Sequence, residues 1–167
     1  MAGVDDCTYS DPMLRRTALL MFAVAALMAA AAPVASADDA SVLKAWTAEN
    51  KTLSKLEKQL DGQIKASKAN AAISTIGKIR KLVARRKKAL AAEEPSTSDG
   101  KDGKSLALAN LRDYDAAMVK LKRGIEAAVA RKGSQAQTYF NQYRALIKKA
   151  ANYEKRANQQ FKEAGVL

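Results

Sequence analysis

The residues with the clearest chemistry in this sequence are the cations between positions 78 and 88. Four of them are spaced by three, four and three residues, a spacing that places side chains on one face of a helix. Ammonium and guanidinium groups in such a row bind phosphate and carboxylate groups through charge-assisted hydrogen bonds. The predicted anion-binding face consists of Lys78, Lys81, Arg85 and Lys88, supported by Arg86 and Lys87.

The charge of the whole chain favours the same chemistry. The chain holds 29 Lys and Arg against 17 Asp and Glu, a net charge of +12, and residues 38–167 alone carry +13. A field of this size draws a protein toward polyanions. The expected partners are an anionic polymer or anionic surface of the cell envelope, or an acidic protein. The alternative interpretation is a solvated face that keeps the chain soluble.

The sequence lacks the residues and motifs that other kinds of chemistry require. Histidine is absent and the only cysteine is Cys7, so an imidazole base and the Cys and His sets that bind structural zinc are missing. Phosphate-loop and nucleophile-elbow motifs are also absent. The carboxylates Glu93, Glu94, Asp99 and Asp102 share one polar stretch without the spacing of a calcium loop. We therefore expect no catalytic residue, no metal, no cofactor and no small-molecule substrate.

Aromatic residues among the basic ones raise nucleic acid as a further partner. Tyr139, Phe140, Tyr143 and Tyr153 lie near lysines and arginines, as in a platform that stacks bases. Phe140 and Tyr143, however, fall on an apolar stripe, and so does Trp46, which predicts core positions for all three. Nucleic acid therefore ranks below an envelope component.

The elements that must position the basic face are helices. Apolar residues recur every three or four residues in four segments, typical of helices that pack at shallow, coiled-coil-like angles. The segments run over residues 42–64, 72–90, 111–128 and 136–161. They predict an all-α, up-down-up-down four-helix bundle made of two helical hairpins, residues 38–92 and 106–167, joined by a linker loop at 93–105. One unbroken helix over residues 41–91 is the alternative for the first half.

The predicted turns inside the hairpins differ in strength. Around residue 133 the sequence indicates a helix end at Gly133, whose missing side chain permits the left-handed conformation. Ser134 and Gln137 then have the spacing of a capping box for the next helix. The corresponding turn, near residues 66–70, contains no glycine.

The first 37 residues are typical of a signal peptide. Arg15 and Arg16 precede an apolar run over residues 17–34, and Ala35, Ser36 and Ala37 form a small-residue cleavage site. Residues 1–12 are acidic and polar, which suggests a mis-assigned start and translation from Met13. We expect cleavage before Asp38 and a secreted or cell-envelope protein, while an uncleaved leader would anchor the chain in the membrane.

These observations predict an exported, non-enzymatic helical bundle that binds an anionic envelope component or acidic partner through a basic face. The first alternative is an adaptor that binds other proteins through its helical surfaces. The second is an exported nucleic-acid-binding protein. Salt separates charge-driven binding, which weakens as ionic strength rises, from an apolar interface.

Overall fold

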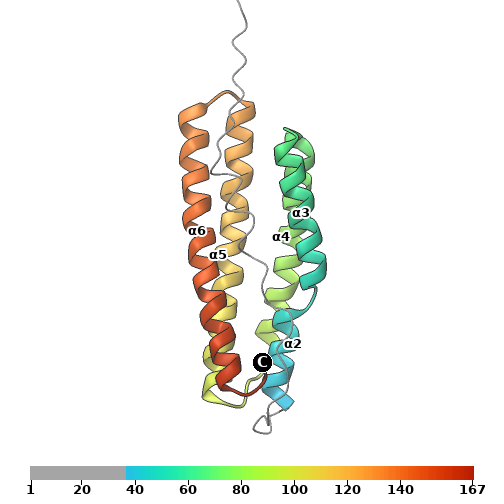
Figure 1. Ribbon diagram of the computed structural model, residues 1–167, viewed down its shortest axis with the longest axis vertical. Coiled ribbons are helices and arrows are strands. Elements are labelled where there is room, and N and C mark those ends of the chain that lie inside the picture. Colours follow the sequence, from blue (N-terminus) through green and yellow to red (C-terminus); the bar gives the residue numbers. More distant parts are fainter. Residues whose placement is uncertain (1–36) are drawn as a thin grey trace, which may run out of the picture.

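The computed structural model describes residues 37–167 and is all-helical, with no strand in that range (Figure 1), which confirms the predicted all-α class. The helices are α2 (Ala37–Thr47), α3 (Asn50–Lys65), α4 (Ala69–Ala92), α5 (Ser98–Val129) and α6 (Gly133–Glu163). The predicted signal peptide lies, apart from Ala37, outside the described residues.

The helices pack side by side as two antiparallel hairpins. The α5–α6 pair has by far the most extensive contact, α4 packs on α5, and α3 packs on α4. The α6 helix therefore lies at one side of the molecule and α3 at the other, with α5 and α4 between them (Figure 1). The short helix α2 contacts both α4 and α5 at the end of the molecule that holds the C-terminus.

The first predicted helix is divided in the structure. It breaks between α2 and α3 at Ala48 and Glu49, and Glu49 has a left-handed backbone with φ 61°. Neither glycine nor proline marks this point. The alternative of one unbroken helix over residues 41–91 is wrong, because the chain also turns back at residues 66–68.

The predicted linker at 93–105 is too long. The helix α5 begins at Ser98, where Thr97 caps it by accepting a hydrogen bond from the Gly100 amide at 2.9 Å. Gly103, which the sequence indicates as a loop residue, is a buried helical position: a Cβ there would lie 2.7 Å from the ring of Phe161. The connection therefore consists of residues 93–97.

A buried carboxylate fixes this connection to the start of the described chain. Asp39 on α2 is fully buried and accepts hydrogen bonds from the Ser96 amide at 2.9 Å and the Thr97 hydroxyl at 2.7 Å. Its position near the first turn of α5 also suits the positive end of that helix. A Cβ on Gly100 would lie 2.2 Å from the Asp39 carboxylate, so this approach requires glycine.

The two hairpin turns share one geometry, which differs from the predicted one. Ser67 and Arg131 are the left-handed residues, with φ 54° and 55°. After each of them a lysine amide bonds back across the turn, from Lys68 to the Gln63 carbonyl and from Lys132 to the Ala127 carbonyl, both at 2.9 Å. The prediction for Gly133 is wrong: Gly133 is the first residue of α6, whose N-terminus has no side-chain cap.

The core runs along the contact faces of α4, α5 and α6. Trp46, predicted to be a core residue, is 6 % exposed. Phe140 and Tyr143 are half-buried against the core, on the side that their apolar spacing predicts. Of the helices described here, none is both long enough and apolar enough to cross a bilayer.

Candidate anion-binding face and the polar groups behind it

The predicted basic row is exposed on one side of α4. Lys78, Lys81, Arg85 and Lys88 are all solvent-exposed, whereas Ile76, Ile79, Leu82, Val83 and Leu90 are buried on the opposite side. We call these four cations the α4 face. Lys87 is exposed as well, but it lies toward the flank of the helix, nearer the buried side. From Lys78 to Lys88 the row extends about 15 Å along the helix.

The lysines of the α4 face keep their charges available. Lys78, Lys81 and Lys88 have neither a hydrogen bond nor an ion pair within the described part of the chain. Arg85 differs, because its guanidinium lies 3.2 Å from the Glu49 carboxylate, with its side chain 65 % exposed. The exposed lysines are therefore the groups of this face that have no competing internal anion.

Arg86 does not belong to this face, so its place in the predicted site is wrong. It is 4 % exposed, and its guanidinium lies over the ring of Trp46, 5.2 Å from the ring centroid. It also donates a hydrogen bond to the Trp46 carbonyl oxygen. Arg86 follows Val83 by three residues and precedes Leu90 by four, so its spacing on the apolar stripe was the signal for burial.

The two neighbouring arginines together hold the break between α2 and α3. In a continuous helix the Trp46 carbonyl oxygen would accept a hydrogen bond from the backbone amide four residues later. Here it accepts a hydrogen bond from the Arg86 guanidinium instead. Arg85 pairs with Glu49, the residue whose left-handed backbone turns the chain. A sequence feature that indicates anion binding thus has, in part, a structural role.

Behind the face, Arg86 lies among acidic and phenolic groups from other helices. The Tyr114 hydroxyl on α5 donates to the Glu57 carboxylate on α3. Burial raises the pKa of the Glu57 carboxyl, and this hydrogen bond lowers it only in part. Burial also raises the pKa of Glu154 on α6, against the attraction of Arg86. The Arg86 Nε–H has no hydrogen-bond partner.

This polar cluster includes residues from all five helices of the described chain. Trp46 on α2 donates from its indole nitrogen to the Asn158 side chain on α6 at 3.3 Å. Burial, and next the nearby Glu57, raise the pKa of Tyr143 to about 12. Within residues 37–167, no three acidic side chains come close enough together to hold a metal ion. The cluster therefore links the helices through polar contacts between residues far apart in sequence.

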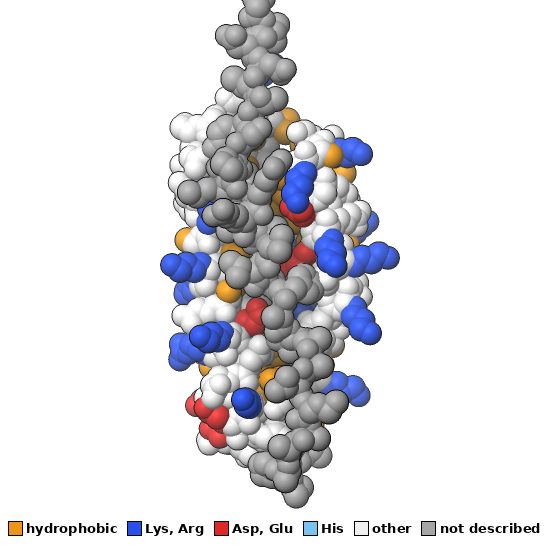
Figure 2. All heavy atoms as spheres, in the orientation of Figure 1, with side chains coloured by type: hydrophobic (Ala, Val, Ile, Leu, Met, Phe, Trp, Pro, Cys, Tyr) orange, Lys and Arg blue, Asp and Glu red, His pale blue; other side chains and the backbone are white. Residues whose placement is uncertain are grey.

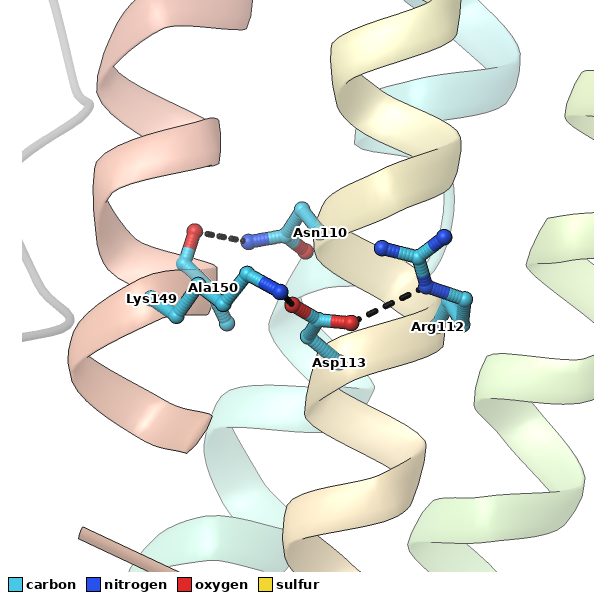
Figure 3. A network of polar contacts seen from close by, with 5 residues as sticks. All are labelled: Asn110, Arg112, Asp113, Lys149 and Ala150. Carbon is cyan, nitrogen blue, oxygen red and sulfur yellow. Dashed lines mark hydrogen bonds and ion pairs between the residues drawn. The ribbon is translucent and has the colours of Figure 1, made fainter. Parts of the chain in front are cut away.

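A second polar network lies between α5 and α6 (Figure 3). The Asn110 amide donates to the Ala150 carbonyl at 2.8 Å, while the Asp113 carboxylate contacts Arg112 at 3.0 Å and Lys149 at 3.1 Å. Burial alone would raise the pKa of Asp113, but the hydrogen bonds from Arg112 and Lys149 outweigh it and lower the pKa. Asn110 and Asp113 are both buried polar residues.

The aromatic residues proposed for base stacking are already engaged. The Lys120 ammonium lies 5.8 Å from the Tyr139 ring centroid, and that of Lys149 lies 5.7 Å from the Tyr153 centroid. The Phe140 ring packs against Gly124 so closely that a Cβ on this glycine would lie 2.6 Å from the ring. No continuous exposed row of rings is formed by these four residues.

Comparison with known proteins adds no assignment. No protein family, no curated protein and no solved structure matches this chain. The function must therefore be argued from the charges and contacts described above.

Proposed function

We propose that this protein is a non-enzymatic helical bundle that binds an anionic component of the cell envelope through the α4 face. The observation that carries the proposal is the row of three exposed lysines without internal partners, Lys78, Lys81 and Lys88. Seven cations and no acidic residue occur in α4. Solubility alone does not require such segregation, because interspersed charges of both signs provide it equally well.

The alternatives have less support. An adaptor needs an apolar surface for its partner, but within residues 37–167 the only large hydrophobic side chains that are exposed are Val129, at the end of α5, and Leu167, beyond the end of α6. A nucleic-acid partner would gain from free aromatic rings, whereas Tyr139 and Tyr153 are covered by lysines. We also propose that the protein is exported, which the pattern of the first 37 residues supports. Sequencing the N-terminus of the exported protein should then give Asp38 as its first residue.

The test is a binding titration of the purified protein with duplex DNA, anionic lipid vesicles and an acidic cell-wall polymer, at low and physiological salt. The variant Lys78→Gln/Lys81→Gln/Lys88→Gln removes the free lysines of the α4 face. With each lysine contributing about 1 kcal/mol near an anionic surface, its affinity for the preferred probe should fall about a hundredfold. Arg85 is left in place because it also holds Glu49.

A matched control removes three charges elsewhere. Lys44, Lys51 and Lys55 are exposed on α2 and α3, and none has a partner within the described residues. Replacing all three with Gln changes the net charge by the same amount as the α4 variant. Because these lysines lie outside the α4 face, their loss should weaken binding by less than about tenfold. Equal losses in the two variants would show that only the overall charge matters and would overturn the proposed role of the α4 face.

A further inference from the structure

The excess positive charge is concentrated on two helices that do not adjoin. Seven Lys and Arg and no acid occur in α4, and six Lys and Arg against two acids occur in α6. The helix between them, α5, is almost balanced, with six cations and five acids, while α3 has four cations and two acids. The net charge of residues 38–167 is therefore held mainly by α4 and α6.

The two basic helices present their charges in different directions. Both pack on α5, and each turns its buried residues toward the shared core, so their exposed sides face away from each other. In the view of Figure 2, Lys and Arg side chains line both long edges of the molecule. A single flat surface or a single extended polymer cannot lie along both sides at once.

The exposed side of α6 has the groups that an anionic chain requires. We define the α6 face as Lys148, Asn152, Lys155 and Arg156, which are all exposed and have no partner among the described residues. A shallow hollow lies over Ala145 and Ala151, bordered by Lys148, Asn152 and Lys155. The small side chains give an acidic group access to the lysines, and the Asn152 amide supplies a neutral donor.

We propose that the protein binds two linear polyanions at once, one on the α4 face and one on the α6 face, and thereby cross-links them. This inference rests on the proposed function, to which it adds the second face and the cross-linking. A polymer is favoured over a lipid bilayer because neither face carries an exposed large hydrophobic side chain that would insert into a membrane. Two faces pointing apart hold two chains together, whereas one face only coats a chain.

The test uses long-chain inorganic polyphosphate as the probe and measures two quantities separately. Isothermal titration with a short polyphosphate counts the bound chains, and light scattering with the long polymer reports cross-linking. Scattering should rise to a maximum and then fall as protein is added in excess, because each chain is then saturated by molecules bound through one face.

Two variants separate the faces. One is Lys78→Gln/Lys81→Gln/Lys88→Gln on α4, and the other is Lys148→Gln/Lys155→Gln/Arg156→Gln on α6. Each should bind one short chain instead of two and scatter about tenfold less, while the control Lys44→Gln/Lys51→Gln/Lys55→Gln keeps both properties. Helicity measured by circular dichroism identifies any variant that fails to fold, in which case the single charge reversals Lys81→Glu and Lys155→Glu replace the triple variants.

The outcomes distinguish this inference from the proposed function. A protein that binds one chain through the α4 face and never cross-links retains the proposed function and overturns the second face. If neither the α4 variant nor the α6 variant loses binding, the proposed function and the cross-linking inference are both overturned. Clustering of anionic vesicles without cross-linking of polyphosphate would identify a membrane as the partner and overturn the polymer proposal.

Discussion

The two hairpins have the same turn geometry but are held together in different ways. The α5–α6 hairpin has two uninterrupted helices that approach closely, with Phe161 over Gly103 and Phe140 over Gly124. The α3–α4 hairpin has a short α3, of which Leu60 is the one buried residue. Its N-terminal end depends on Arg86, which connects α4 to the carbonyl and ring of Trp46.

The carboxylates Asp113 and Glu57, one in each hairpin, show the same contrast. Asp113 in the α5–α6 hairpin has two cations within 3.1 Å and a lowered pKa, so it is stabilised as an anion. Glu57 on α3 accepts from a phenol and has a raised pKa, so burial disfavours its charge. The difference indicates that the polar groups of the α5–α6 hairpin are the better paired, whereas the α3–α4 hairpin depends on a few polar residues.

The largest effect is expected from Arg86→Met. The substitution leaves the Trp46 carbonyl and the half-buried Glu154 without their cation, and removing one member of a buried charged group costs about 3 kcal/mol of unfolding free energy. The cost should shrink as the pH falls through the raised pKa of Glu154, because that carboxyl group then becomes neutral. Urea unfolding followed by circular dichroism measures both values.

The neighbouring arginine is the control. Arg85→Met removes an exposed ion pair with Glu49 and should cost less than about 0.5 kcal/mol. If both substitutions had equal effects, the distinction between a structural Arg86 and an exposed Arg85 would be lost.

Glycine to alanine substitutions should have opposite signs in the two hairpins. In Gly103→Ala the new methyl group meets the fully buried ring of Phe161, and such overpacking costs about 2 kcal/mol. In Gly77→Ala, on α4, no atom lies within 4 Å of the new Cβ, so alanine's helix propensity should stabilise the protein by about 1 kcal/mol. Thermal melting of the two variants compares them directly, and stabilisation by Gly103→Ala would contradict the close packing of α5 on α6.

The two carboxylates should give opposite pH dependences. Because the folded state raises the pKa of Glu57, stability decreases as pH rises through that value, and Glu57→Gln should stabilise the protein near pH 7 on the order of 1 kcal/mol. Because the folded state lowers the pKa of Asp113, stability is lost as pH falls below its ordinary 3.8, and Asp113→Asn should destabilise near neutral pH by a similar amount.

Unfolding free energies measured between about pH 3 and pH 8 check both signs. The Glu57→Gln difference should shrink toward the acidic end of this range, where the Glu57 carboxyl group is protonated in the folded and unfolded states alike. The Asp113→Asn difference should begin to shrink only as the pH falls below 3.8, because the folded state holds the pKa of Asp113 below that value. A Glu57→Gln variant that is less stable than the unsubstituted protein at pH 7 would mean that Arg86 stabilises the Glu57 anion more than burial destabilises it.

Apolar spacing was sufficient to predict the helical class and the exposed side of α4. Lys78, Lys81 and Lys88 are exposed because Ile76, Ile79 and Val83 occupy the other side of the same helix. The position of Arg86 on the apolar stripe predicts burial, whereas its charge predicts an exposed, anion-binding position. A cation on an apolar stripe is a signal for a buried polar contact, and the partner must come from another helix.

Other features depend on contacts between residues far apart in sequence. The break at Glu49 has no local signal, because the group that replaces the helical hydrogen bond is Arg86, on another helix. The start of α5 was missed because Gly100 and Gly103 are glycines for steric reasons, to admit Asp39 and Phe161, rather than for loop flexibility. Helical periodicity describes one element at a time and contains no information on such pairs.

The smallest expected effect tests what the hairpins have in common. Ser67 and Arg131 both have left-handed backbones, in which glycine is less strained than a residue with a side chain. Ser67→Gly and Arg131→Gly should therefore each stabilise the protein by about 0.5 kcal/mol, less than the full relief because glycine is also more flexible when unfolded. Differential scanning calorimetry resolves the small shifts in Tm, with Ser134→Gly on the first turn of α6 as a destabilising control. Unequal shifts would show that one turn is held by its surroundings, so the contrast between the hairpins would extend to their turns.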